Sequence, residues 1–345
     1  MMGPMGSQEA AIEEQLLTDA RRGEESSFER LVLLHRREIA AHCYGMLGSI
    51  QDAEDALQET LLAAWRGLDD FDGRSSLRTW LFTVATNVCL RLSSRRGPRM
   101  LSMDHGPSRS DPQDLGEPVT GPVWLEPWPH DVAGHEDDPE VAYLRRESIE
   151  LAFVAALQHL PGTQRAVLIL RQALGFSAAE AAAILGTTPA SVNSAMQRAR
   201  AALAERVPEK SQQAELASLG PDGRRQLVDA FVSAWERSDV PALLDLLTED
   251  ARFTMPPLPA WFDGRANVGR FMAERMFASP WRLTAIEANA QPGFACYRYE
   301  GERFVLGAIN LLSLRDGRIT WIAAFVDPQL YRWFPVSAGS LLPDR

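Results

Sequence analysis

Hydrophobic and polar positions in residues 176–203 repeat with helical spacing in two runs, separated by a short break. Ser177 followed three residues later by Glu180 is a capping-box pattern, which predicts the start of a short helix. Gly186 can end that helix in the left-handed conformation, and Thr188 followed by a proline predicts a second helix start. The stretch therefore predicts two helices joined by a tight turn.

The second of these helices has two different faces. Its apolar stripe, which must face a core, consists of Val192, Met196, Ala199 and Leu203. The opposite face carries Ala190, Ser194, Gln197, Arg198 and Ala201, with Asn193 and Arg200 on the flanks. Small residues let a helix lie deep in the major groove, while amide and guanidinium groups can read base edges or bind phosphates. This pattern favours DNA binding, and an ordinary helical hairpin with a solvated face is the alternative.

A second pair of helices is expected in residues 52–66 and from Ser75 or Ser76 onward. Acidic residues gather at the start of the first helix, where they also favour the helix dipole. The second helix is expected to bury Trp80, Leu81, Val84, Val88 and Leu92. Its other face is expected to hold Thr79, Phe82, Thr83, Thr86 and Asn87, followed by terminal arginines. An aromatic ring, hydroxyls, an amide and cations suit unpaired bases next to a phosphate backbone, although a protein partner would fit equally.

From Asp222 the pattern changes to helix, helix, strand, helix and then four strands, with a hairpin turn at Asp316-Gly317. This order predicts an α+β domain. Aromatic and sulfur-containing side chains in it are candidates for lining a pocket that binds a small-molecule ligand, although core packing explains them as well. The candidates are Trp235, Met255, Trp261, Phe262, Trp281, Tyr297 and Trp321.

Charge is distributed unevenly along this 345-residue chain of net charge -11. Residues 28–72 hold nine acidic residues against four arginines, whereas residues 73–99 hold six arginines and no acidic residue. Only the second stretch should attract phosphate. Residues 100–140 hold ten acidic residues against one arginine and are crowded with proline and glycine, so we expect an extended linker there.

Composition excludes several classes of protein. Apolar residues make up 46% of the chain, which is typical of globular proteins, and no apolar run reaches the ~18 residues of a membrane span. The first residues lack a signal-peptide pattern, so a cytoplasmic protein without membrane contact is expected. Its three cysteines are widely spaced, and we expect no metal, cofactor or catalytic residue. All six histidines precede the α+β segment, which argues against an enzyme.

Two stretches resemble one known family. DAEDALQETLLAAW followed by FDGRSSLRTWLFTVATNVCLRLSSRR resembles region 2 of bacterial sigma-70-type factors of the extracytoplasmic-function (ECF) group. LPGTQRAVLILRQALGFSAAEAAAILGTTPASVNSAMQRARAAL resembles region 4 of the same family. MPPLPAWFDGRANV followed by ANAQPGFACYRYEG resembles the SnoaL-like, or NTF2-like, domain appended to certain sigma factors. The resemblance implies a multidomain protein with two all-α sigma domains and a C-terminal α+β cone.

The resemblance also implies partners and sites. The partners would be the RNA polymerase core, through its beta-prime clamp and beta flap, and promoter DNA. The polymerase-binding residues would be Asp52, Glu54, Asp55, Gln58 and Glu59. The melted minus-10 element would meet Phe71, Arg74, Ser75, Arg78, Thr79, Phe82, Thr83, Asn87, Arg91, Arg95 and Arg96. The minus-35 element would meet Arg171, Ser191, Asn193, Ser194, Gln197, Arg198 and Arg200. The acidic linker would occupy the polymerase channel where RNA later passes.

The expected organisation follows from these assignments. The domains are an N-terminal extension (1–24), region 2 (25–99), the acidic linker (100–140), region 4 (141–206), a second linker (207–221), the SnoaL-like domain (222–335) and a tail (336–345). The expected function is promoter-specific transcription initiation, with the C-terminal domain regulating activity in cis. A ligand-responsive helix-turn-helix regulator and a SnoaL-type enzyme are the alternatives.

Overall fold

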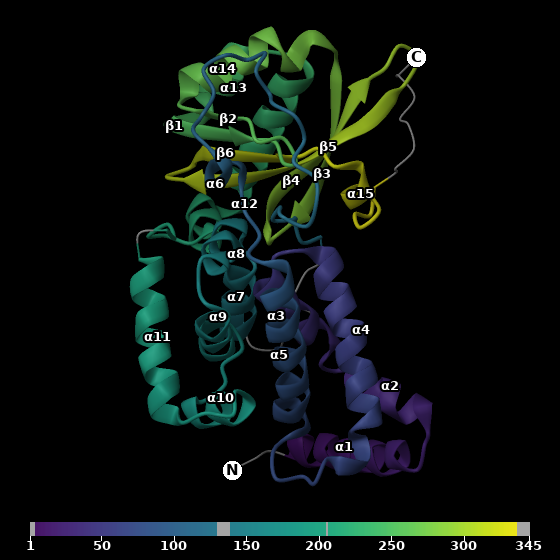
Figure 1. Ribbon diagram of the computed structural model, residues 1–345. Coiled ribbons are helices and arrows are strands. Elements are labelled where there is room, and N and C mark those ends of the chain that lie inside the picture. Colours follow the sequence, from purple (N-terminus) through teal and green to yellow (C-terminus); the bar gives the residue numbers. More distant parts are fainter. Residues whose placement is uncertain (1–3, 130–138, 205, 337–345) are drawn as a thin grey trace. The chain divides into compact units, whose positions relative to one another are not determined.

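The computed structural model describes residues 4–129, 139–204 and 206–336 (Figure 1). Contacts divide the chain into two compact units. A helical unit comprises Met1–Gly97 and Leu157–Ala204, and a mixed unit comprises Pro98–Ala156 and Glu205–Arg345. Within the described residues, no helix has the length and apolar character to cross a membrane. The expected tail falls largely outside the described residues.

The helical unit is built from short helices with polar caps. Its elements are α1 (Pro4–Arg21), α2 (Glu25–Leu33), α3 (Arg36–Leu47), α4 (Ile50–Arg66), η1 (Leu68–Asp70), α5 (Leu77–Arg96), α9 (Gly162–Leu168), η2 (Ile169–Ala173), α10 (Ala178–Ile184) and α11 (Pro189–Leu203). Ser49 and Ser76 cap α4 and α5 by accepting hydrogen bonds from the backbone N–H groups of Asp52 and Thr79. α5 contacts α3 and α4 and also α9 and α10, so helices surround it.

The burial of α5 differs from the expected two-faced pattern. Leu81 and Val88 are buried as expected, but Trp80, Val84 and Leu92 are only half-buried. Thr79, Phe82 and Thr86, which were placed on the exposed face, are buried. α9 and α10 pack against α5 in addition to α3 and α4, so α5 buries side chains on more than one face. Periodicity within α5 alone cannot reveal a second packing partner.

The helix-turn-helix prediction is confirmed. Ser177 Oγ accepts from Glu180 N at 3.1 Å, and Ser177 N donates back to the Glu180 carboxylate at 2.8 Å. Gly186 has φ +60°, the left-handed region that glycine tolerates, and Thr188 caps α11. Val192, Ala199 and Leu203 are buried, and Met196 is half-buried.

The mixed unit contains one six-stranded sheet in the order β2-β1-β6-β5-β4-β3. Its strands are β1 (Leu247–Thr254), β2 (Trp261–Asp263), β3 (Trp281–Ala288), β4 (Gln291–Tyr299), β5 (Phe304–Arg315) and β6 (Arg318–Phe325). Its helices are α6 (Ser102–His105), α7 (Pro139–Ser148), α12 (Gln212–Glu236), α13 (Val240–Asp245), α14 (Arg265–Glu274), η3 (Met276–Ala278) and α15 (Pro328–Tyr331). The boundary between the two units falls within one further helix, α8 (Leu151–Gln158). The expected order is confirmed except for β2, a three-residue strand too short to show a period.

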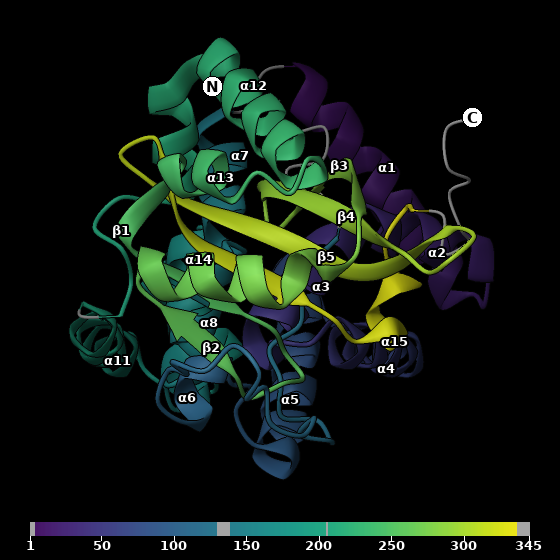
Figure 2. The ribbon, with the colours of Figure 1, turned by 90° about the horizontal axis from the view of Figure 1, so that it is seen from above.

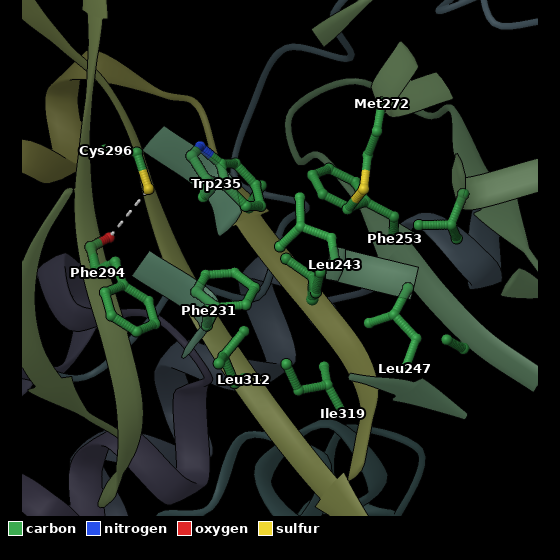
Figure 3. Close-up of a cluster of buried hydrophobic side chains, with 14 of the residues drawn as sticks. Phe231, Trp235, Leu243, Leu247, Phe253, Met272, Phe294, Cys296, Leu312 and Ile319 are labelled. Atoms are coloured by element: carbon green, nitrogen blue, oxygen red, sulfur yellow. Dashed lines mark hydrogen bonds between the residues drawn. The ribbon is translucent and has the colours of Figure 1, made fainter. Parts of the chain in front are cut away.

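Helices α12, α13 and α14 lie across one face of the sheet and bury an apolar core (Figures 2 and 3). Trp235, Met255 and Phe262, three of the predicted pocket residues, pack within this core, and Trp281 packs against it. Tyr297 and Trp321 are buried outside this cluster, and Trp261 is half-buried. The predicted set therefore divides between core packing and other contacts.

The acidic linker was expected to be extended and without helix or strand. Its described part, residues 100–129, instead contains α6 and packs on the C-terminal domain. Arg109 N donates to Trp261 O at 2.8 Å, and Val119 N donates to Pro257 O at 2.9 Å. Trp261 Nε1 donates to Gly106 O at 2.8 Å. Every residue other than proline can donate and accept such backbone hydrogen bonds, so the sequence of side chains does not predict them. Residues 130–138 lie outside the described residues.

The second expected linker, 207–221, is also partly helical. α12 begins at Gln212 with Ser211 as its cap, and it bends where Gly220 has φ +66° and Pro221 follows. The glycine and proline that suggested a linker thus mark a kink between two helical stretches.

A group of buried and half-buried polar side chains ties three segments of the mixed unit together. We call Asn289, Gln291, Gln212, Gln213 and Glu150 the polar hub. Asn289 accepts from Trp128 N at 2.8 Å through Oδ1 and donates to Ile149 O at 2.6 Å through Nδ2. Gln291 Oε1 accepts from Leu151 N at 2.8 Å. The hub thereby fixes the linker near Trp128 and the start of α8.

The same hub fixes the start of α12. Gln213 N donates to Glu150 Oε1 at 2.8 Å, and Gln212 exchanges two hydrogen bonds with the backbone of Leu314. Burial raises the pKa of Glu150 to about 7 from its ordinary 4.5, while hydrogen bonds from the backbone of Gln212 and Gln213 act in the opposite direction. Glu147 raises the pKa further. The segments that precede and follow residues 157–204 in the chain therefore meet at the carboxyl group of Glu150.

Glu150 should make stability fall as pH rises. Between about pH 4.5 and 7 the folded chain holds more protons at this group than the unfolded chain, so the free energy of unfolding decreases by about 3 kcal/mol across that window. Glu150→Gln, which keeps an acceptor for Gln213 N, should unfold at a higher urea concentration than the wild type at pH 8 and at a similar one at pH 4. Exposed Glu209→Gln is the control, and equal pH slopes for all three proteins would contradict this role.

Candidate nucleic-acid interface

The outward face of α11 gathers most of the residues predicted for minus-35 DNA. Ser191, Asn193, Ser194, Gln197, Arg198 and Arg200 all lie on this helix and are exposed. The helix contains no acidic residue, so its charge is that of its two arginines. Its buried stripe fixes the rotation of the helix, which leaves the amides and guanidinium groups directed away from the core. The face can therefore offer hydrogen-bond donors to base edges and phosphates.

Arg171 is separated from this group. It lies in η2, a turn of π-helix, and its guanidinium donates to the backbone carbonyl of Phe176. π-helical turns inside α-helices often occur at functional positions. In this structure, however, the side chain of Arg171 supports the chain just before α10.

The residues predicted for minus-10 DNA fall into an exposed and a buried set. Arg74, Ser75, Asn87, Arg91, Arg95 and Arg96 are exposed, and Arg78 and Thr83 are half-buried. Phe71, Thr79 and Phe82 are buried. The centre of the Phe71 ring lies 5.2 Å from the centre of the Trp80 ring. The Arg21 guanidinium lies over the Phe71 ring, 5.8 Å from its centroid. The exposed arginines of α5, Arg91, Arg95 and Arg96, lie in its last two turns, whereas Arg74 and Ser75 precede the helix.

Acidic residues of α4 pair with arginines of α5. Arg91 contacts Glu59, and Arg96 contacts Asp52 and lies 3.9 Å from Asp55. Sequence reasoning assigned the acids to a protein partner and the arginines to DNA, and it did not connect them. A half-exposed ion pair such as Arg91–Glu59 contributes little to stability. They do set the direction of the arginine side chains, because each guanidinium is held toward α4.

The predicted polymerase-binding helix presents only part of its acidic set. Asp52 is buried beside Arg96, and Glu54 and Glu59 are half-buried. Asp55 and Gln58 are exposed, and next to them Leu62 retains 55% of its accessible surface. An exposed leucine among acidic and amide side chains is suited to a protein partner with apolar and basic groups.

Three further residues were not predicted from the sequence. Glu38 of α3 accepts from Arg78 at 2.9 Å, and Arg165 and Gln158 donate to backbone carbonyls of α3. Their partners are 40 or more residues away in the chain, so no local motif could reveal them. Among the described residues, no cluster of histidine, cysteine, aspartate and glutamate has the arrangement of a metal site.

Three protein families match successive parts of the chain. The Sigma-70 region 2 family matches residues 31–99, the Sigma-70 region 4 family matches 150–203, and the SnoaL-like domain family matches 228–322. ECF RNA polymerase sigma factor SigG of Mycobacterium tuberculosis is 39% identical over 319 residues, which cover 92% of this chain and 85% of that protein.

A second relative matches along nearly the whole chain. ECF RNA polymerase sigma factor SigJ of Mycobacterium tuberculosis is 29% identical over 341 residues, which cover 93% of this chain and 97% of that protein. The crystal structure of the M. tuberculosis extracytoplasmic function sigma factor SigJ has the same fold, with a TM-score of 0.58 and 21% identity over 88% of this chain and 97% of that chain.

Proposed function

The chain belongs to the family of ECF RNA polymerase sigma factors with a SnoaL-like C-terminal domain, and from this premise we propose how its parts act in transcription initiation. Region 4 reads the minus-35 element through the exposed face of α11. Region 2 binds the polymerase core through α4 and the melted minus-10 element through α5. The observation that carries this proposal is the uniformly exposed, cationic and amide-rich face of α11 on a capped helix-turn-helix.

Mixing the purified full chain with core polymerase and a promoter library tests this proposal directly. Promoter-specific transcripts that appear only in the presence of both proteins are expected. Tight binding to duplex DNA without polymerase, and no new transcripts, would favour a ligand-responsive helix-turn-helix regulator instead. The comparison separates the two functions because only a sigma factor needs the core to read DNA.

Exposed positions on α4 should decide core binding. Asp55→Arg combined with Gln58→Arg places two cations where the proposed polymerase contact has acid and amide, so like charges would face a basic partner. Such repulsion costs several kcal/mol, and the dissociation constant for core polymerase should rise about 100-fold. Fluorescence anisotropy with labelled full chain measures it.

The control for this pair is Asp69→Arg, which also adds a cation at an exposed position but lies outside α4. Its affinity for the core should stay within about twofold of the wild type, since a single remote surface charge is largely screened. Equal weakening by both variants would mean that net charge, and no specific surface of α4, controls binding.

We assign the C-terminal domain a regulatory role in cis. The described linker packs on this domain through backbone hydrogen bonds at Arg109 and Val119 and through the hub at Trp128. Trp124, Leu125 and Trp128 are buried in that arrangement. If the linker enters the polymerase channel during initiation, these contacts must break first. The domain would then act as a brake whose strength equals the free energy of linker release.

This role needs binding, not catalysis, and we propose that the chain is not an enzyme. A small-molecule ligand in the C-terminal core stays a prediction. Trp235 Nε1 and Asn310 Oδ1 in this domain are buried and have no hydrogen-bond partner within the described residues. A ligand that reached and satisfied either atom would stabilise the domain.

A further inference from the structure

The loop formed by residues 71–76 joins η1 to α5, and its middle is open to solvent while both of its ends are fixed. The residues from Asp72 to Ser76 are exposed. At the end of the loop, Ser76 caps α5 by accepting a backbone hydrogen bond at 3.1 Å. Within the loop, Arg74 N donates to Asp72 Oδ1 at 3.1 Å, and Gly73 has φ +75°, a conformation that glycine tolerates. The loop therefore presents a defined turn at the surface of region 2.

The start of this loop is held by a residue of α1. The Arg21 guanidinium donates through Nη2 to the backbone carbonyl of Phe71. It also lies over the Phe71 ring, 5.8 Å from the centroid, which is within the range of a cation–π contact. The same ring lies 5.2 Å from the ring of Trp80. Phe71 thereby joins α1 to α5 at the first residue of the loop.

α1 is itself packed against region 2. Leu16 and Ala20 are buried on this helix, which contacts α2 and η1. Arg21 is its last residue and precedes residues 31–99, the segment that matches Sigma-70 region 2. All the residues assigned to minus-10 DNA lie within that matched segment, so α1 has no role in the assignment. The contact with Phe71 nevertheless connects α1 to it.

An anchored loop has an advantage in recognition. A loop that already has its binding conformation binds without the entropic cost of ordering it. Discrimination between bases also requires that the contacting groups be placed to within roughly 0.5 Å. Arg74 and Ser75 provide a guanidinium and a hydroxyl group at the exposed turn. Because Arg21 binds the carbonyl at the first residue of the loop, a rotation there would displace both of these groups.

We propose that Arg21 is a positioning residue for promoter recognition, which holds Phe71 and thereby fixes loop 71–76 in the conformation that receives unpaired minus-10 bases. The inference rests on the proposed function, because it takes region 2 to bind the melted minus-10 element. Phe71 keeps 5% of its accessible surface, so it anchors the loop and does not offer its ring to a base. The exposed Arg74 and Ser75 make the contacts with DNA.

Transcription by the full chain with core polymerase, from a library randomised in the minus-10 element, tests the inference. Arg21→Ala removes both contacts with Phe71 from an exposed position, so it leaves no buried cavity. Preference for the favoured base should fall about tenfold at the positions that the loop contacts and stay within about twofold elsewhere. The four residues 72–75 span at most about 14 Å, so those positions are about one or two neighbouring bases.

Two further variants are matched to this one. Arg22→Ala removes the same charge at the next position, where the guanidinium contacts Asp19 at 3.4 Å, and should keep the wild-type preference at every minus-10 position. Arg21→Lys retains a cation that can donate to the Phe71 carbonyl, and its preference should stay within about threefold of the wild type.

Hydrogen exchange in the free chain provides a second measurement that does not depend on transcription. The amides of Phe71 and Arg74 are bonded within this segment, to Leu68 O at 3.2 Å and to Asp72 Oδ1 at 3.1 Å. Arg21→Ala should speed their exchange at least about tenfold and leave the amides of α4 and α5 unchanged. Faster exchange throughout region 2 would show that Arg21 supports the whole fold, which would overturn the inference.

The transcription experiment separates this inference from the proposed function. If the wild type gives no promoter-specific transcripts with core polymerase, the proposed function falls, and the role of Arg21 falls with it. If the wild type discriminates normally, the proposed function stands, and Arg21→Ala alone decides the inference. An unchanged preference, or an equal loss at every minus-10 position, would then overturn the role of Arg21.

Discussion

Replacing Arg198 by alanine should reduce discrimination at one position of the minus-35 element by about 5- to 150-fold, which corresponds to 1 to 3 kcal/mol. Arg198 is exposed at the centre of the outward face of α11, beside Gln197, on a helix whose rotation is fixed by its buried stripe. A guanidinium in this position can donate two hydrogen bonds to one guanine, and the wrong base leaves those donors unpaired. Transcription from a library randomised in the minus-35 element measures the loss.

Arg200→Ala is the matched control because it removes the same charge from the flank of the same helix. It should weaken every sequence in the library by a similar factor and should reduce the salt dependence by about one phosphate contact. The two variants therefore separate base reading from phosphate binding. If Arg198→Ala also weakens all sequences equally, then Arg198 contacts phosphate, and the base-reading role passes to Gln197 or Asn193.

The helix-turn-helix could be predicted from the sequence because every signal in it is local. Ser177 and Glu180 satisfy one helix start, Thr188 satisfies the next, and the apolar stripe of α11 repeats within four turns. Each of these interactions joins residues three or four positions apart, where side-chain type alone decides the geometry. The exposed set on α11 follows from that rotation, so the candidate minus-35 residues other than Arg171 lie together on the exposed side of one helix.

Region 2 shows what local patterns omit. The face of α5 that carries Phe82 was expected to be exposed, because its mixture of hydroxyls and an amide is polar on average. Phe82 is instead covered by Phe176, which is 94 positions away, and Thr86 on the same face finds a partner in His42, whose ring nitrogen lies 3.0 Å from Thr86 Oγ1. Hydrogen bonding makes the burial of a hydroxyl acceptable, so polarity alone did not reveal the second packing surface.

The linker was misjudged for a related reason. Its acidic residues and prolines are typical of extended chains, and its contacts with the C-terminal domain are made largely by backbone groups, as at Arg109 and Val119. Two tryptophans within it, Trp124 and Trp128, were the available signal, since exposed tryptophans in a linker would be unfavourable. Their burial accounts for the position of the linker better than its charge does.

Weakening the linker contacts should raise transcription from the full chain. Asn289→Ala removes the side-chain hydrogen bonds to Trp128 N and Ile149 O, and Trp261→Phe removes the one to Gly106 O. Each buried group left unpaired costs about 1 to 3 kcal/mol, so the double variant should release the linker at least about tenfold more often. Trypsin cleavage after Arg109 measures release, because cleavage requires local opening of that segment. Transcription with core polymerase should increase in parallel.

Point substitutions are a sharper test than removal of residues 208–345, because deletion would expose Trp128 and Leu125 and change the linker itself. Arg298→Ala is the control, since it removes a hydrogen bond to Glu300 in the same domain and leaves the linker hydrogen bonds at Pro257, Trp261 and Asn289 in place. Faster cleavage with unchanged transcription would mean that the linker is held but does not act as a brake. Unchanged cleavage would mean that the remaining contacts suffice to hold it. Only a parallel rise in the cleavage rate and in transcription makes linker release the step that the C-terminal domain controls. In that case, the free energy that the linker loses in packing lowers the free energy needed to start transcription.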